Sequence, residues 1–156
     1  MDTLDESVKP LIQAFLAQMD SAMRVSEVLA NHNSPNKEIT ADHIIGGLVF
    51  RLMVPMTNEE LDQSLSSAKQ IMDKLDQTDS EESEESDEDY DEIQECYPIE
   101  SRKESRRVKY PHCNCDICSK VRICILNYHQ HECTDPLADK FRNAINHTCE
   151  QHKLLL

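Results

Sequence analysis

The chain has 156 residues, a formal net charge of −14 at pH 7 and 38% hydrophobic residues, with no tryptophan and only three phenylalanines. This composition is too poor in large apolar side chains to fill one large core, so we expect two small folded units joined by a linker. The longest apolar run, residues 44–50, is far shorter than the roughly 20 residues that a membrane-spanning helix requires, which argues against a membrane protein.

Residues 1–75 are predicted to form three helices, arranged as a helical bundle or as a dimerisation unit. Apolar residues recur at helical spacing over residues 10–30, and the polar residues 31–36 indicate a loop. Thr40 can cap a second helix, which a proline ends, and residues 57–60 form a capping box that starts a third.

The second predicted helix is apolar nearly all round, which is more apolar surface than a contact with one neighbouring helix can cover. Gly46 and Gly47 lie inside it, at a cost of about 2 kcal/mol in helix propensity, so they indicate a close approach of another helix or a kink. The helices of residues 1–75 could therefore bind a protein partner or form a homo-oligomer.

Residues 76–111 are predicted to be a disordered linker, acidic in its first part and basic in its second. Residues 76–95 contain twelve acidic side chains and no basic one, a charge density that prevents collapse. Three serines in the tract have the spacing of an acidophilic-kinase substrate, with phosphorylation predicted at Ser80, Ser83 and Ser86. The tract could equally be a solvated spacer, and either interpretation indicates expression in a eukaryotic cell or in a virus that grows in one.

The basic part of the linker precedes the cysteine-rich end of the chain. Its positive side chains are Arg102, Lys103, Arg106, Arg107 and Lys109. Such an arm can grip the phosphates of a nucleic acid, but the acidic tract nearby could instead mask it through an intramolecular contact.

Residues 112–156 are predicted to form a zinc-binding helical hairpin. The expected ligands of one structural Zn²⁺ ion are two short pairs, Cys115 with Cys118 and Cys149 with His152. Between the pairs the sequence indicates two helices of similar length, with Asp135 and a following proline at the start of the second. If these helices are antiparallel, the second pair returns beside the first.

The sequence contains more candidate ligands than one ion can use. His112 and Cys113 lie directly before Cys115 and could replace a member of the set. Cys124 is interpreted as an ordinary thiol of the hairpin. A second cluster of candidate ligands, which could hold another metal or simply be turn residues, consists of His129, His131 and Cys133.

The redox state of the cysteines follows from their number and from the amino terminus. Seven is an odd number of cysteines, and the first residues have neither the basic nor the apolar region of a secretory signal. We therefore expect an intracellular, reducing compartment, the cytoplasm or the nucleus, in which thiolates bind metal instead of forming disulfides.

The last part of the chain, residues 113–156, resembles small cysteine-rich proteins of large DNA viruses that infect protists. The resemblance lies in Cys115-Asp-Ile-Cys118, Val121-Arg122, Cys124, Asn127-Tyr128, residues 135–141 and Thr148-Cys149-Glu-Gln-His152. It implies a viral origin, with the protein in the host cell or the virion, and it implies no activity.

Together these features predict an all-α, non-enzymatic zinc-binding adaptor or regulatory protein that acts through protein–protein contacts. A zinc site with four protein ligands has no open position for catalysis, and the sequence has no glycine-rich phosphate loop. The alternative is a nucleic-acid-associated regulator of transcription or of RNA, which would use residues 102–109 and the zinc module.

Overall fold

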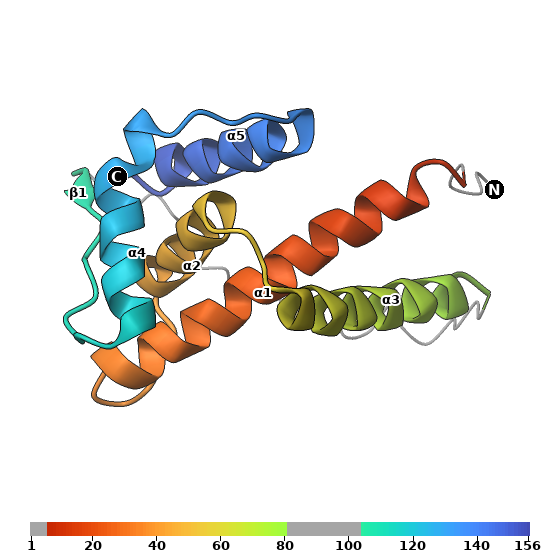
Figure 1. The fold of residues 1–156 in the computed structure, drawn as a ribbon, viewed down its shortest axis with the longest axis horizontal. Coiled ribbons are helices and arrows are strands. Elements are labelled where there is room, and N and C mark those ends of the chain that lie inside the picture. Colours follow the sequence, from red (N-terminus) through yellow and green to blue (C-terminus); the bar gives the residue numbers. More distant parts are fainter. Residues whose placement is uncertain (1–5, 81–103) are drawn as a thin grey trace.

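The computed structural model describes residues 6–80 and 104–156, which form a predominantly helical protein, as predicted (Figure 1). The elements, in chain order, are α1 (Lys9–Asn33), α2 (Ala41–Met53), α3 (Asn58–Ser80), β1 (Arg106–Arg107), α4 (Asp116–Asn127), the short 3₁₀ helix η3 (Tyr128–Gln130), α5 (Pro136–Gln151) and β2 (Leu154–Leu155). Within the described residues, no helix is both long enough and apolar enough to span a membrane.

The predicted helix starts are confirmed by their capping contacts. At the start of α2, the backbone N–H of Thr40 donates to His43 Nδ1 at 3.0 Å. At the start of α3, the backbone N–H of Glu60 donates to Thr57 Oγ1 at 3.2 Å. Asp135 accepts a hydrogen bond from the backbone of Ala138 at 2.8 Å at the start of α5. Each cap satisfies a backbone donor that the helix itself leaves unpaired.

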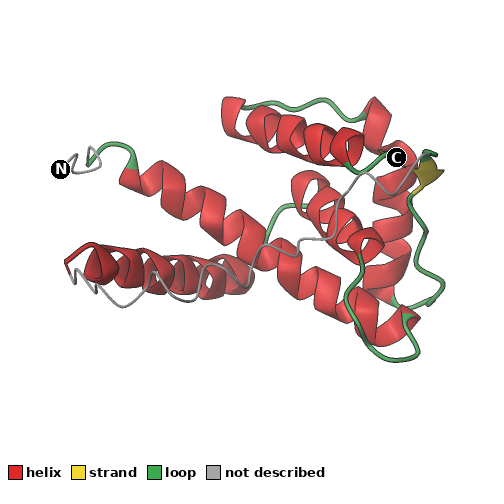
Figure 2. Ribbon diagram, turned by 180° about the vertical axis from the view of Figure 1, so that it is seen from behind, coloured by secondary structure: helices red, strands yellow, loops and turns green. Residues whose placement is uncertain are grey.

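The two units that the sequence predicts, residues 1–75 and 112–156, share one hydrophobic core. In Figure 2 α2 lies among α1, α4 and α5, and α2 packs against all three. The buried core residues come from both units and, with Val108, from the predicted linker between them: Val25, Leu29, Ile45, Val49, Phe50, Val108, Cys118, Val121, Cys124, Ile125, Tyr128, Phe141, Ile145, Cys149 and Leu154. The reason lies in α2, whose apolar surface extends nearly all round and needs partners on more than one side.

The two glycines of α2 permit these close contacts, as predicted. A Cβ at Gly47 would lie 2.4 Å from the carbonyl oxygen of Ala22 in α1, and a Cβ at Gly46 would lie 3.3 Å from Val121 Cγ1 in α4. Helix α2 therefore approaches α1 backbone to backbone, whereas its contact with α4 involves side chains.

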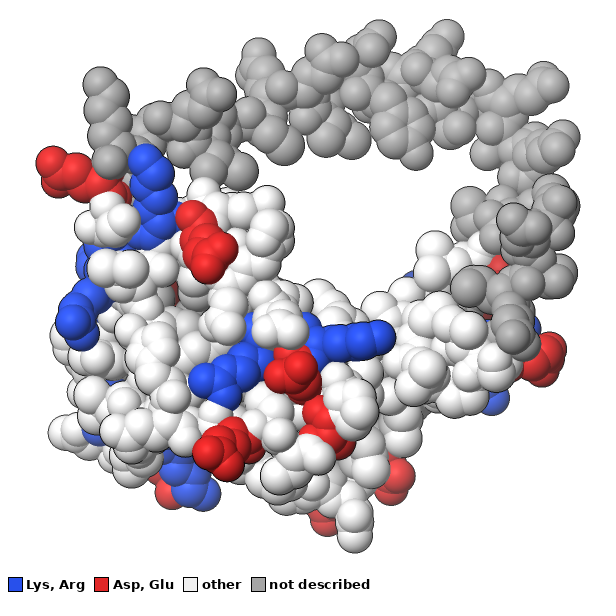
Figure 3. Space-filling view, turned by 90° about the horizontal axis from the view of Figure 1, so that it is seen from above, with Lys and Arg blue, Asp and Glu red and all other residues white. Residues whose placement is uncertain are grey.

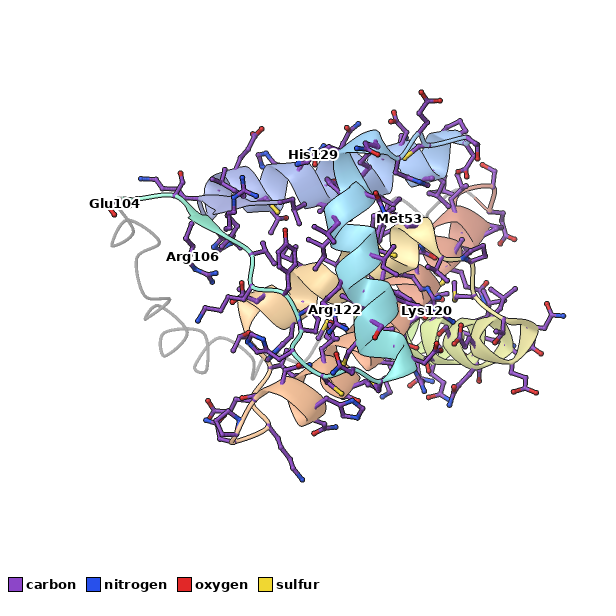
Figure 4. All side chains as sticks on the ribbon, turned by 60° about the vertical axis from the view of Figure 1, so that its left-hand side comes forward. Met53, Glu104, Arg106, Lys120, Arg122 and His129 are labelled. Carbon is purple, nitrogen blue, oxygen red and sulfur yellow. The ribbon has the colours of Figure 1, made fainter. Side chains whose placement is uncertain are left out.

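The last two helices, α4 and α5, were expected to lie antiparallel, but they cross each other. In Figures 1 and 4, α4 runs steeply across the direction of α5. The hydroxyl of Tyr128 in η3 donates to Asn146 Oδ1 at 2.5 Å, and His129 Nε2 lies 2.8 Å from the backbone oxygen of Leu156. The last residues of the chain therefore return to the carboxyl end of α4 and not to its start.

Residues 104–111, expected to belong to the linker, are part of the folded body. Strand β1 pairs in parallel with β2, with Arg106 opposite Leu154, and Val108 is only 3% exposed. The Arg106 guanidinium donates to both carboxylate oxygens of Asp42 in α2, at 2.7 and 3.0 Å, and the backbone N–H of Lys109 donates to the same carboxylate at 2.9 Å.

At the other side of the predicted linker, α3 continues to Ser80, five residues beyond its expected end at residue 75. Most of the acidic tract, including Ser83 and Ser86, lies outside the described residues, as do Arg102 and Lys103.

We predict that replacing Gly47 with alanine destabilises the fold, because its methyl group would collide with the α1 backbone at Ala22. Overpacking of this kind costs about 1–3 kcal/mol, which outweighs the gain in helix propensity of about 1 kcal/mol. The matched control is Gly46→Ala, whose nearest neighbours are side-chain methyl groups of Leu29 and Val121 and not backbone atoms. In urea unfolding, G47A should be less stable than G46A, and equal stabilities would contradict the close approach of α1 and α2.

We also predict that Asp42→Asn lowers the free energy of unfolding at neutral pH by about 1.5–3 kcal/mol, because charge-assisted hydrogen bonds are lost. Burial raises the pKa of Asp42, but the bonds from Arg106 and Lys109 outweigh this effect and leave that pKa below its usual value. The contribution of Asp42 is therefore complete above the unfolded-state pKa of about 4 and is lost as the pH falls through the folded-state pKa.

Unfolding curves from neutral to acid pH provide the measurement. The stability difference between wild type and D42N should shrink at acid pH, whereas Asp62→Asn, at an exposed position of α3, should change little at any pH. A difference that stays constant down to acid pH would contradict the role of the ion pair.

Candidate metal centre

One nitrogen and three sulfur atoms converge where the end of α1 meets the segment before α4. They belong to His32, Cys113, Cys115 and Cys118, and all four lie within 4.8 Å of one another. The three cysteines are free and form no disulfide. These side chains are close enough to bind a metal ion together.

The spacing of the cluster fits a tetrahedral site. His32 Nδ1 lies 3.2 Å from the sulfur of Cys115, 3.5 Å from that of Cys113 and 3.8 Å from that of Cys118. In a tetrahedron with metal–nitrogen bonds of about 2.0–2.1 Å and metal–sulfur bonds of about 2.3 Å, a nitrogen and a sulfur ligand are about 3.5 Å apart. The three distances scatter around this value.

Local backbone geometry brings the three sulfurs to one point. Cys115 is the N-cap residue of α4, and its sulfur accepts the backbone N–H of Cys118 at 3.4 Å. The sulfur of Cys113 accepts the backbone N–H of Cys115, also at 3.4 Å. The helix start therefore directs a backbone donor at the Cys115 sulfur, which favours the ionised form of that thiol.

Two of the thiols have opposite pKa shifts. The backbone hydrogen bond from Cys118 is the main cause that lowers the pKa of Cys115 to about 6. Burial raises the pKa of Cys118 to about 12, because its side chain is closed off from water at 0% exposure. A bound cation would supply the positive charge that the buried Cys118 thiolate requires.

Arg122 of α4 holds the segment that carries Cys113. Its guanidinium donates to the backbone oxygens of Pro111 at 2.7 Å and Cys113 at 2.6 Å, and to Asn114 Oδ1 at 3.2 Å. Figure 4 shows Arg122 on α4 beside this segment. The arginine thus serves as a structural clamp for the ligands.

The structure corrects half of the ligand set that the sequence predicts. Cys115 and Cys118 belong to the cluster, and Cys113, the alternative ligand, belongs to it as well. Cys149 and His152 do not. Cys149 is 5% exposed within the hydrophobic core, where burial raises its pKa, and His152 follows α5 at the far end of α4. Because α4 has twelve residues, its two ends are about 18 Å apart.

The remaining candidate ligands lie outside the cluster. The side chain of His112 is not part of it, and Cys124 is a buried thiol whose pKa is raised by burial. In the parts of the chain that the structure describes, no second group of metal-binding side chains forms around His129, His131 and Cys133. The ring of His129 instead contacts the backbone oxygen of Leu156.

Sequence reasoning missed His32, which is 81 residues away from Cys113. It lies in a polar stretch that reads as a loop, although α1 extends through it to Asn33. One signal could have pointed to a distant ligand: the three cysteines lie within six residues and leave one tetrahedral position for another part of the chain.

The basic arm is only partly available for phosphates. Arg106 is bound to Asp42 in the ion pair described above, and acidic side chains are interspersed with lysines and arginines on the face shown in Figure 3. Arg107 and Lys109 are the other members of the arm that the structure describes.

An apolar groove lies between the first half of α1 and the start of α5. It has a volume of about 420 Å³ and is lined by Leu11, Ile12, Phe15, Leu16, Pro136, Leu137 and Lys140. Leu11 is 56% exposed, and Phe15 packs edge to face against Phe141 at 5.5 Å. The groove is apolar except for its one lysine.

No known protein family, curated protein or solved structure was found to match this chain. The resemblance to viral cysteine-rich proteins therefore stays a prediction.

We predict that the full-length protein binds one equivalent of Zn²⁺, and that Cys118→Ser or His32→Ala removes most of the affinity because each takes away one of four ligands. Cys149→Ser is the matched control, since Cys149 lies in the core and outside the cluster. Metal content after dialysis, together with competition against a chromogenic chelator, provides the measurement. If C149S lost zinc while H32A kept it, the ligand set predicted from the sequence would be right, and the cluster of His32, Cys113, Cys115 and Cys118 would not be the metal site.

Proposed function

We propose that this protein is a non-enzymatic zinc-binding adaptor. A structural Zn²⁺ ion bound by His32, Cys113, Cys115 and Cys118 stabilises the helical body, and the groove between α1 and α5 receives an amphipathic helix of a partner protein. The observation that carries the proposal is the convergence of four ligand atoms within 4.8 Å from two distant parts of the chain.

The chemistry of the ligands favours zinc. Three thiolates and one imidazole are a common ligand set of structural zinc sites, and soft thiolate ligands disfavour magnesium and calcium, which prefer oxygen. The distances from His32 Nδ1 to the three sulfurs, 3.2, 3.5 and 3.8 Å, agree with the ligand spacing of a zinc site.

A structural role agrees with the number and burial of the ligands. A catalytic zinc ion has three protein ligands and leaves one position for water or substrate, whereas this site offers four. The buried sulfur of Cys118 also restricts access to the ion from one side.

The ion would join segments 81 residues apart, one on each side of the acidic tract. In the chain-entropy treatment of cross-links, closing a loop of this length contributes up to about 4–5 kcal/mol. Because a site of this kind does not form in the unfolded chain, the binding energy of the ion becomes folding energy.

The groove indicates the chemistry of the partner. Its apolar lining suits the apolar face of a helix, which docks through residues at positions i, i+3 or i+4, and i+7. Lys140 is the one charged residue in the lining, so a carboxylate at the edge of the partner helix would be complementary to it.

The nucleic-acid alternative has less support, because Asp42 already holds Arg106. It stays a prediction for the remaining basic residues.

The groove can be tested on the zinc-loaded full-length protein with an anilinonaphthalene sulfonate dye, whose aromatic body and anionic group match the apolar lining and Lys140. We expect one saturable site that Leu11→Gln weakens and Leu126→Gln does not. Both leucines are exposed, at 56% and 63%, but Leu126 lies on α4, away from the groove.

The same three proteins then serve as baits for partner proteins. A partner that docks in the groove is retained by wild type and L126Q and lost by L11Q. If every captured protein is retained equally by all three, or if the dye does not distinguish the two variants, the adaptor proposal is wrong.

A further inference from the structure

We propose that Asn33 is the positioning residue of this metal site, and that its side-chain amide aligns the ligand segment of residues 112–118 with His32. The inference rests on the zinc site proposed above and adds a residue that touches the ligands without binding the ion itself. It follows from four hydrogen bonds made by one side chain.

The oxygen of the Asn33 amide holds the start of the ligand segment. Oδ1 accepts the backbone N–H of His112 at 2.6 Å and the backbone N–H of Cys113 at 2.8 Å. These bonds fix the backbone directly before the first sulfur ligand. Because Asn33 follows His32 in the chain, the same residue ties that backbone to the histidine ligand.

The nitrogen of the Asn33 amide donates hydrogen bonds to α1 and to one of the sulfur ligands. Nδ2 donates to the sulfur of Cys118 at 3.4 Å and to the backbone oxygen of Leu29 at 2.8 Å. The bond to Leu29 anchors the side chain on α1, and the bond to Cys118 places a donor against the most buried sulfur of the site. Hydrogen bonds to metal-bound thiolates orient them and partly neutralise their charge.

This pattern requires an amide in one orientation. The oxygen faces two N–H donors, whereas the nitrogen faces a carbonyl oxygen and a sulfur, so the reversed amide would leave four mismatched contacts. A carboxylate could accept the two N–H bonds, but it would face the Cys118 thiolate with a like charge and without a donor. An alanine would lose all four bonds.

Asn127 offers a matched control. Its Nδ2 donates to the backbone oxygen of Ile123 at 3.0 Å, which is the same bond to the residue four positions earlier that Asn33 makes to Leu29. Asn127 ends α4, so it lies at the opposite end of that helix from Cys115 and Cys118. A change at Asn127 therefore removes the shared contact and leaves the ligand segment intact.

The experiment measures the affinity of the full-length protein for Zn²⁺ by chelator competition, and the absorption of the Co²⁺ form, whose sulfur-to-metal and d–d bands report the ligand geometry. We expect Asn33→Ala to weaken zinc binding about 10–100-fold, as changes in residues that orient metal ligands commonly do. Asn127→Ala should bind like wild type. Asn33→Asp retains the acceptor for His112 and Cys113, so it should fold, bind zinc more weakly than wild type and show altered Co²⁺ bands.

The inference is overturned if N33A and N33D both bind zinc like wild type and give unchanged Co²⁺ bands. It is also overturned if N127A loses as much affinity as N33A, because the effect would then come from the helix end alone. Both outcomes concern the role of Asn33 and leave the assignment of the four zinc ligands unchanged. Failure of the wild-type protein to bind zinc at all is a different result, which would refute the proposed function.

Discussion

The contact between the end of α1 and the segment before α4 joins parts of the chain that are 81 residues apart, and the candidate metal site depends on it. At this point His32 meets three cysteine sulfurs, and Asn33 holds the backbone that carries the first of them. As thiolates, the three sulfurs of this cluster would repel one another unless a cation lay among them. A metal ion bound at this point would therefore be coupled to the fold through the same few residues.

Helix α2 supplies the second constraint, because it is buried among helices from both parts of the chain. Gly47 brings its backbone against α1, and Val121 of α4 packs against its other side near Gly46. The ion pair of Asp42 with Arg106 closes the start of α2 against β1. With α1, α2 and α4 held in this way, the first half of α1 comes to lie beside α5, and the apolar groove forms between them.

Much of the local structure could be predicted from the sequence, since helix starts depend on neighbouring residues. Thr57 and Asp135 are caps because their side chains accept backbone N–H groups three residues on, and at the start of α2 the ring of His43 accepts the backbone N–H of Thr40, three residues before it. The pairing of Cys115 with Cys118 as candidate ligands could be predicted for a similar reason, because cysteines at this short spacing form a common ligand pair of zinc sites. The fourth ligand could not, because its place depends on how α1 packs.

The sequence by itself determined the helices, the acidic tract, the free thiols and a cysteine-rich group of candidate metal ligands. These follow from composition and from patterns that extend over a few residues. The tertiary structure decided that one core unites the two predicted units, that β1 belongs to it, and that Cys113 and His32 take the two places expected for Cys149 and His152. The physical reason is the crossing of α4 and α5, which carries Cys149 into the core and places His152 one helix length away from Cys115.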